Sequence, residues 1–333
     1  MSRVDYAAIH AGRHSARMIA TLIRGACMVA LILSAPAGIL NALLTHLAPG
    51  VHVSGHAAFA QTRTPAFDKG LLWRVEKPGI APSYLFGTAH LADKRVTALP
   101  DVVRKELDAA RSFTMEVALD PSSVLTLAAR MVYTDGRDLP GVAGEGLYRR
   151  VVPLMQNLGL PPEVARMFKP WAMVLLLQMP QQQAADVLDA TLHRIASQQG
   201  KALSYLETVD EQVAAFENMS DAEQVALLGL AVETHAGLKA ATEKLVQAYL
   251  QRDLGMMWQI GEADVAQRPE LKPLKAVFDQ RLLFDRNTRM IDRMQPQLKS
   301  GQAFVAVGAL HLYGERGLLS LLARDGYRVS RVY

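Results

Sequence analysis

One eight-residue phrase occurs twice in this chain of 333 residues. The first copy, Tyr-Leu-Phe-Gly-Thr-Ala-His-Leu, covers residues 84–91, and the second, Val-Ala-Val-Gly-Ala-Leu-His-Leu, covers residues 305–312. Each reads as three apolar residues followed by Gly-x-x-His-Leu, which predicts a buried strand that ends at a histidine-bearing turn. Because α/β folds keep their chemistry at the carboxyl ends of strands, we expect His90 and His311 to converge on one site.

The Gly-x-x-His spacing alone carries little weight, because 9 His and 23 Gly in a chain of this length produce it readily by chance. The shared apolar triplet and the trailing Leu make coincidence less plausible. A purely structural interpretation stays open at this point. In that interpretation each glycine ends a buried strand and each histidine is an ordinary loop residue.

Residues 1–60 differ in composition from the rest of the chain. They hold four Arg against one Asp, and no charged side chain occurs in residues 25–62. The apolar run at residues 27–33 and the small-x-small sequence Ala58-Phe59-Ala60 complete the pattern of a secretory signal peptide. We therefore expect an exported, periplasmic protein whose domain covers residues 61–333.

Two alternatives concern this leader. Residues 25–44 are long enough to span a bilayer, so an uncleaved anchor in the inner membrane is the competing interpretation, although Pro36 and Asn41 interrupt the apolar stretch. Translation from Met18 instead of Met1 would give the signal peptide a more ordinary length.

The charge of the chain is concentrated in the same leader. The whole chain has a formal net charge of +4, whereas residues 61–333 carry 32 basic and 31 acidic side chains. This near-neutral balance gives no support for a nucleic-acid partner. The only cysteine, Cys27, also lies in the leader, which excludes a cysteine nucleophile in the exported protein.

Strand patterns gather at the two ends of residues 61–333, with helical patterns between them. The predicted strands and helices of the two ends are residues 71–76, 83–86, 102–110 and 112–117, then 302–307, 314–325 and 327–332. Residues 121–298 are helical in pattern apart from a strand at 202–206. The sequence predicts an α+β protein: one mixed sheet built from N- and C-terminal βα units, with a large helical insertion at residues 121–298.

Glu116 is the candidate third member of the histidine site. It lies near the end of the strand at 112–117, so a parallel arrangement would bring its carboxylate to the edge that carries His90 and His311. Two imidazoles and a carboxylate are a familiar catalytic metal set. The same three groups could also act without a metal, with a histidine or Glu116 as general base.

Further candidates have balanced interpretations. Arg286-Asn287 lies in a helical stretch where Asn is a poor helix former, which indicates a functional role, and a salt-bridged surface is the equally weighted alternative. Glu207 follows the inserted strand and is interpreted as a capping or solvated residue rather than a site residue. His193 and His235 lie in helical patterns and are taken as structural.

The ordered set of motifs resembles the TraB/GumN family, which is related in motif to the Tiki proteases. The matching features are Leu-Trp-Arg-Val at residues 72–75, the two Gly-x-x-His phrases, Glu116, Leu-Glu-Thr at 206–208 with Glu-Gln at 211–212, and Arg-Asn at 286–287. The resemblance covers roughly residues 70–333. It implies an erythromycin-esterase/ChaN-like fold, with His90, His311 and Glu116 at a divalent metal and Arg286 and Asn287 as supporting catalytic residues.

Two functions remain in competition at this stage. The first is a periplasmic metal-dependent hydrolase, metallopeptidase-like, that acts on exported peptides or proteins with Mn, Co or Zn at the histidine site. The second is a non-catalytic module that binds and sequesters a peptide. In the first, replacing His90 or His311 abolishes metal binding, and in the second, a captured peptide is recovered intact.

Overall fold

The computed structural model describes residues 67–118, 120–178 and 187–333. The predicted signal peptide (1–60) and the candidate anchor (25–44) lie outside these residues. Within them, no helix has the length and apolar character needed to cross a membrane. The described chain divides into two compact units, which we name by their content.

The sheet unit comprises residues 67–117, 187–207 and 234–333. Its six strands lie in the order β4-β3-β5-β2-β1-β6. Their bounds are β1 Leu72–Glu76, β2 Ser83–Thr88, β3 Ser112–Met115, β4 Ala202–Tyr205, β5 Ala303–Gly308 and β6 Arg328–Arg331. β4, β3, β5 and β2 are parallel neighbours, whereas β1 is antiparallel to both β2 and β6. The predicted mixed sheet of an α+β protein, built from both ends of the chain, is confirmed.

The central strands are the most apolar. Every residue of β5, Ala-Phe-Val-Ala-Val-Gly, is buried, as expected for a parallel strand covered on both faces. The aromatic rings of Phe86 and Phe113, on the strands at either side, contact Phe304 on β5. The edge strands β4 and β6 are short and partly exposed, which limits their capacity to pair with another chain.

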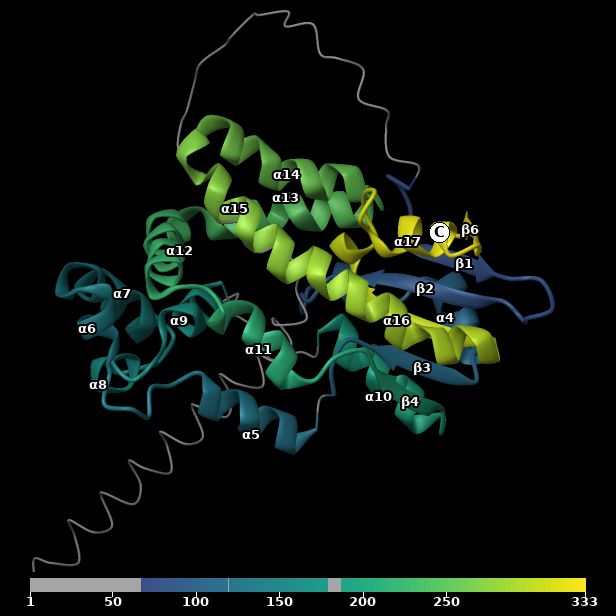
Figure 1. Cartoon of the computed structure of the whole chain (residues 1–333), viewed down its shortest axis with the longest axis horizontal. Helices are drawn as coiled ribbons and strands as arrows, with labels where there is room; N and C mark the ends of the chain where they lie inside the picture. The colour runs from purple at the N-terminus through teal and green to yellow at the C-terminus, as the bar shows by residue number, and fades with distance from the viewer. Residues whose placement is uncertain (1–66, 119, 179–186) are drawn as a thin grey trace, which may run out of the picture. The chain divides into compact units, whose positions relative to one another are not determined.

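Helices and short turns complete the sheet unit. They are α3 Lys94–Thr97, α4 Asp101–Ala109, α10 Leu188–Gln198, η1 His235–Gly237, α13 Leu238–Leu250, α14 Leu254–Gln267, η2 Pro269–Leu271, α15 Lys272–Asp279, the π-helix η3 Gln280–Phe284, α16 Asp285–Ser300, η4 Ala309–His311 and α17 Leu318–Arg324. α16 packs on β5. α10 packs on β3 and α17 packs on β6 (Figure 1). These contacts bring two segments of the predicted insertion, α10 and α16, onto the sheet.

The helical unit comprises residues 118–178, except residue 119, and residues 208–233. Its helices are α5 Pro121–Arg130, α6 Leu139–Ala143, α7 Glu145–Asn157, α8 Pro162–Ala165, α9 Pro170–Leu177, α11 Val209–Glu217 and α12 Asp221–Thr234. α9 is apolar on every face and fully buried, and its Trp171 stacks on Phe216 of α11. Glu217 binds Lys169 and Arg130, so two ion pairs flank this core.

Candidate functional site

The two histidines follow neighbouring parallel strands. β2 and β5 pair with Thr88 opposite Gly308, so both strands end at the same edge. His90 lies two residues beyond β2, and His311 ends the 3-10 turn η4. Both imidazoles are buried. The structure therefore brings together the two residues that the repeated phrase singled out.

Gly87 allows the second segment to approach the first. A Cβ atom at this position would lie 3.0 Å from the Cα atom of Ala309 and 2.9 Å from Cδ1 of Leu312. The hydroxyl of Tyr249 donates a hydrogen bond of 3.0 Å to the Gly87 carbonyl. The glycine is thus required by the space available, because a side chain there would push the two histidine-bearing segments apart.

Glu116 joins the site from the next strand. It directly follows β3, the parallel neighbour of β5, and its side chain is buried. Oε1 accepts a hydrogen bond of 2.7 Å from the Gly308 amide and lies 3.8 Å from Nε2 of His311. Oε2 accepts a bond of 2.5 Å from Arg286. Burial raises the pKa of Glu116 to about 7, although the positive charge of Arg286 acts in the opposite direction.

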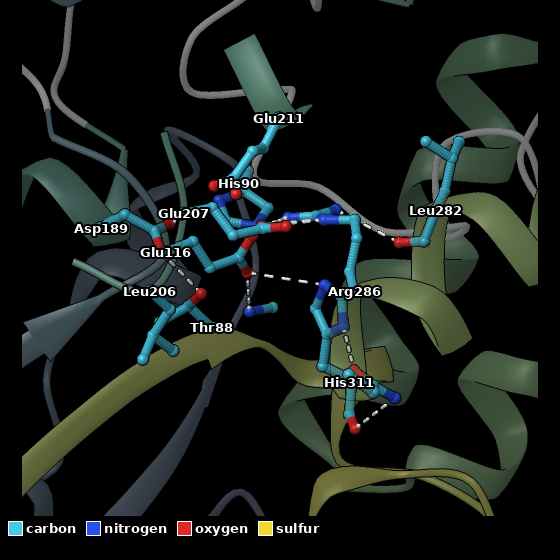
Figure 2. Close-up of polar contacts among 12 residues, drawn as sticks. Thr88, His90, Glu116, Asp189, Leu206, Glu207, Glu211, Leu282, Arg286 and His311 are labelled. Atoms are coloured by element: carbon cyan, nitrogen blue, oxygen red, sulfur yellow. Dashed lines mark hydrogen bonds and ion pairs between the residues drawn. The ribbon is translucent and has the colours of Figure 1, made fainter. Parts of the chain in front are cut away.

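Arg286 ties two carboxylates together inside the protein. Its guanidinium donates to Oε2 of Glu207 through Nε at 2.9 Å and Nη2 at 2.7 Å, besides its bond to Glu116 (Figure 2). Glu207 follows β4 as Glu116 follows β3, so the carboxyl ends of two strands share one guanidinium. The Leu282 carbonyl in the π-helix η3 accepts another bond of 3.2 Å from Arg286. π-Helical turns of this kind often occur at functional sites.

Asn287 positions His311. Its Nδ2 donates to the carbonyl of Arg316 at 2.9 Å and to that of His311 at 3.4 Å, which fixes the orientation of the amide. The Oδ1 atom therefore faces Nδ1 of His311, 2.5 Å away. Since Oδ1 can only accept, Nδ1 of His311 carries the proton and Nε2 points into the site.

Asp189 makes the corresponding contact with His90. Oδ2 lies 2.7 Å from Nδ1 of His90, in an ion pair whose angle is bent away from that of a straight hydrogen bond. Oδ1 accepts a hydrogen bond of 2.7 Å from the Thr88 hydroxyl at the end of β2 (Figure 2). Asp189 lies in the first turn of α10 and is buried.

The two imidazoles have opposite charge preferences. Burial acts to lower the pKa of His90, but the neighbouring Asp189 carboxylate outweighs it and the pKa is raised. Burial lowers the pKa of His311 well below its usual value, and the positive charge of Arg286 lowers it further. His311 is consequently a neutral imidazole, whereas His90 favours the charged form more than an exposed histidine does.

The donor set fits a divalent cation in part. Nε2 of His90 and Nε2 of His311 are buried and have no hydrogen-bond partner among the described residues. Each oxygen of Glu116 accepts one hydrogen bond and keeps a second lone pair. As these side chains lie, however, residues 67–118, 120–178 and 187–333 contain no group of three or more His, Cys, Asp or Glu side chains spaced to hold a metal ion.

Two buried acidic residues of the site, Glu207 and Asp189, differ from the sequence-based expectation. Glu207, taken as a capping or solvated residue, is buried against Arg286. Asp189 is not among the sequence-based candidates, although its helix carries a signal: Asp189 shares the buried face of α10 with Leu188, Leu192, Ile195 and Ala196. An acid on an otherwise apolar face needs a buried partner. His193, taken as structural, contacts the Tyr205 hydroxyl at 3.3 Å.

Comparison with known proteins agrees with the motifs. The chain is similar to Metalloprotease TIKI2 of Danio rerio, 24% identical over 83% of this chain and 64% of that protein. It is also similar to Metalloprotease TIKI2 of Xenopus tropicalis, 26% identical over 78% of this chain and 59% of that protein. Uncharacterized protein YbaP of Escherichia coli (strain K12) is 27% identical over 74% of this chain and 90% of its own length.

The chain thus spans about three fifths of the length of these two metalloproteases. No solved structure gives a significant match. The model of the TraB/PrgY/gumN family matches residues 71–331, from the residue before β1 to the end of β6. The predicted resemblance is therefore confirmed: the chain belongs to the TraB/PrgY/gumN family.

Proposed function

We propose that this protein is a divalent-metal-dependent hydrolase that cleaves peptide bonds. The observation that carries the proposal is the pair of buried Nε2 atoms, of His90 and His311, that lack a partner among the described residues beside Glu116. The metalloprotease names of the TIKI relatives support the same class of reaction.

The charge of the site also supports a cation. Two buried carboxylates, those of Glu116 and Glu207, bind the buried guanidinium of Arg286, and a third, that of Asp189, contacts His90. Arg289 is partly exposed and lies 3.6 Å from Glu207. Carboxylates gathered beside two imidazoles in a buried site form an environment that favours a cation.

His90, His311 and Glu116 are the residues that would hold the metal. A divalent ion such as Mn, Co or Zn would supply polarisation of the scissile carbonyl and a water of lowered pKa. The side chains supply the rest: Nδ1–H contacts orient both imidazoles, and Arg286 fixes the carboxylate of Glu116. Glu116 would serve either as a ligand of the ion or as the general base that takes a proton from water and returns it to the leaving amine.

The test measures metal and turnover together. The full-length protein is stripped with chelator, titrated with Mn, Co and Zn by calorimetry, and incubated with a peptide library that is read by mass spectrometry. We expect about one ion per chain and new peptide termini. Glu116→Gln should remove cleavage, whereas Glu163→Gln, the same change at an exposed site, should not.

The absence of any bound ion in wild-type protein would reject the hydrolase. Peptides that are captured, recovered intact and still bound by His90→Ala would instead favour the peptide-binding module.

Export is part of the proposal. The leader at residues 1–60 supports a periplasmic site of action on exported peptides or proteins. N-terminal sequencing of protein recovered from the periplasm should begin near Gln61. A full-length chain recovered in the membrane fraction would support the anchor at residues 25–44 instead.

A further inference from the structure

The surroundings of His90 differ from those of His311 in one chemical respect. His311 faces the amide oxygen of Asn287, which is neutral, whereas His90 faces the carboxylate of Asp189. Both contacts are made through Nδ1, and both leave Nε2 on the site side without a partner among the described residues. The two imidazoles are thus oriented in the same way by acceptors of unlike charge.

The contact between Asp189 and His90 requires a proton. Although the angle is bent, 2.7 Å is too close for an unprotonated nitrogen and a carboxylate oxygen, which would repel, so Nδ1 carries a hydrogen atom. The second oxygen of Asp189 is fixed by the Thr88 hydroxyl at 2.7 Å. Because Thr88 is the last residue of β2, this hydrogen bond holds the Asp189 carboxylate against the strand that precedes His90.

We infer that Asp189 is a positioning residue that fixes the ring orientation and the tautomer of His90. It thereby makes Nε2 of His90 a stronger metal ligand than Nε2 of His311. This inference rests on the proposed function, since it assigns Nε2 of His90 to the metal. A carboxylate behind a metal-binding histidine raises the basicity of the ligand, and loss of such a partner costs 10- to 100-fold in metal affinity in other proteins. No peptide contact or catalytic step is assigned to Asp189.

Two variants of Asp189 separate the effect of its hydrogen-bond acceptor from the effect of its negative charge. Asp189→Ala removes the acceptor, and Asp189→Asn keeps an oxygen that can face His90 while its amide donates to Thr88. Metal affinity is measured by calorimetry in the full chain. We expect binding about 10- to 100-fold weaker in Asp189→Ala and a smaller loss in Asp189→Asn. The control is Asp279→Asn, the same change at a buried ion pair with Lys275, which should leave affinity unchanged.

A second readout does not depend on metal. Nitrogen NMR of protein labelled at histidine, metal-free and at one pH, reports which ring nitrogen carries the proton, and the His90 signal is identified by its absence in His90→Gln. We expect a protonated Nδ1 in wild type and in Asp189→Asn, and its loss in Asp189→Ala.

An unchanged Nδ1 proton in Asp189→Ala would overturn the inference, as would wild-type metal affinity in both variants. If wild-type protein binds no metal, the proposed hydrolase fails, and the NMR result still decides whether Asp189 positions His90.

Discussion

The two Gly-x-x-His segments, residues 87–90 and 308–311, share one sequence pattern but differ in structure. β2 and β5 pair with Gly87 opposite Val307, one residue short of the alignment that the repeated phrase suggests. Because side chains alternate between faces, this offset places equivalent residues of the two strands on opposite faces of the sheet. The first segment leaves β2 at Thr88 without forming a helical turn, and the Leu91 amide donates to the Ala89 carbonyl, whereas the second turns at once into η4.

The consequence is an asymmetric site built from a repeated pattern. Each histidine reaches the same edge, but Asp189 of α10 meets the first and Asn287 of α16 meets the second. Glu116 is bonded to the second segment alone, through the Gly308 amide. The following variants test whether the two histidines share one function despite these unlike surroundings.

Loss of either histidine should have the largest effect. We expect His90→Ala and His311→Ala each to abolish stoichiometric metal binding, because each removes one of the two available Nε2 donors. Metal content after dialysis, measured by mass spectrometry, checks this. His193→Ala, which alters a contact with Tyr205, should keep full metal content. Normal binding in one of the two site variants would show that the segments do not act together.

Replacement of Arg286 should be the next largest. Arg286→Met leaves Glu116 and Glu207 buried without their shared partner, so we expect a loss of about 3–5 kcal/mol in the free energy of unfolding. Urea unfolding followed by circular dichroism measures it. Arg104→Met alters an exposed pair with Asp108 and should cost at most about 1 kcal/mol. Equal losses would mean that the buried cluster contributes little to stability.

Gly87→Ala tests the close approach of the two segments. The new methyl group would crowd the backbone of Ala309, so we expect about 1–3 kcal/mol of destabilisation and weaker metal binding. Gly146→Ala, at an exposed position of α7 with open space around it, should stabilise the protein by about 0.4–1 kcal/mol. Thermal unfolding of both variants gives the comparison, and a neutral Gly87→Ala would rule out the spacing argument.

The pH dependence of stability should show the smallest effect and opposite signs for the two histidines. His90 has a raised pKa in the folded protein, so its stabilising contribution is complete below pH 6.5 and is lost as pH rises through the folded pKa. His311 has a lowered pKa, so the unfolded chain takes up the proton first and stability falls as pH drops below 6.5.

Urea unfolding of metal-free wild type, His90→Gln and His311→Gln between pH 5 and 8 measures these contributions. The difference between wild type and His90→Gln should shrink as pH rises, and the difference between wild type and His311→Gln should shrink as pH falls. If the free energy of unfolding changed with pH in the same way in all three proteins, Asp189 and Asn287 would not give the two imidazoles different pKa values.

Much of the site was readable from local patterns. His90, His311 and Glu116 each follow an apolar strand, and the rule that parallel strands end at one edge was enough to group them. Asn287 stood out as a poor helix former beside Arg286. Each of these sequence patterns lies within a few residues of the side chain that it points to, so it can be recognised in a single sequence.

Asp189 and Glu207 show where local patterns stop being informative. Glu207 follows its strand as Glu116 does, but whether a strand-end carboxylate is solvated or buried depends on Arg286, 79 residues away. Asp189 occupies a helix whose apolar face gave a hint, but its partner His90 lies nearly a hundred positions earlier in the chain.

The sequence by itself determined the elements and the residues they deliver: apolar strands, the glycine-histidine turns after two of them, and membership of the family. The tertiary structure alone decided the register of β2 against β5, the acceptor behind each imidazole and the sharing of Arg286 by two carboxylates. The physical reason is the distance along the chain over which each kind of interaction acts. Strand and turn preferences act between neighbours in the chain, whereas the pKa and orientation of a buried group are set by whichever charges packing places around it.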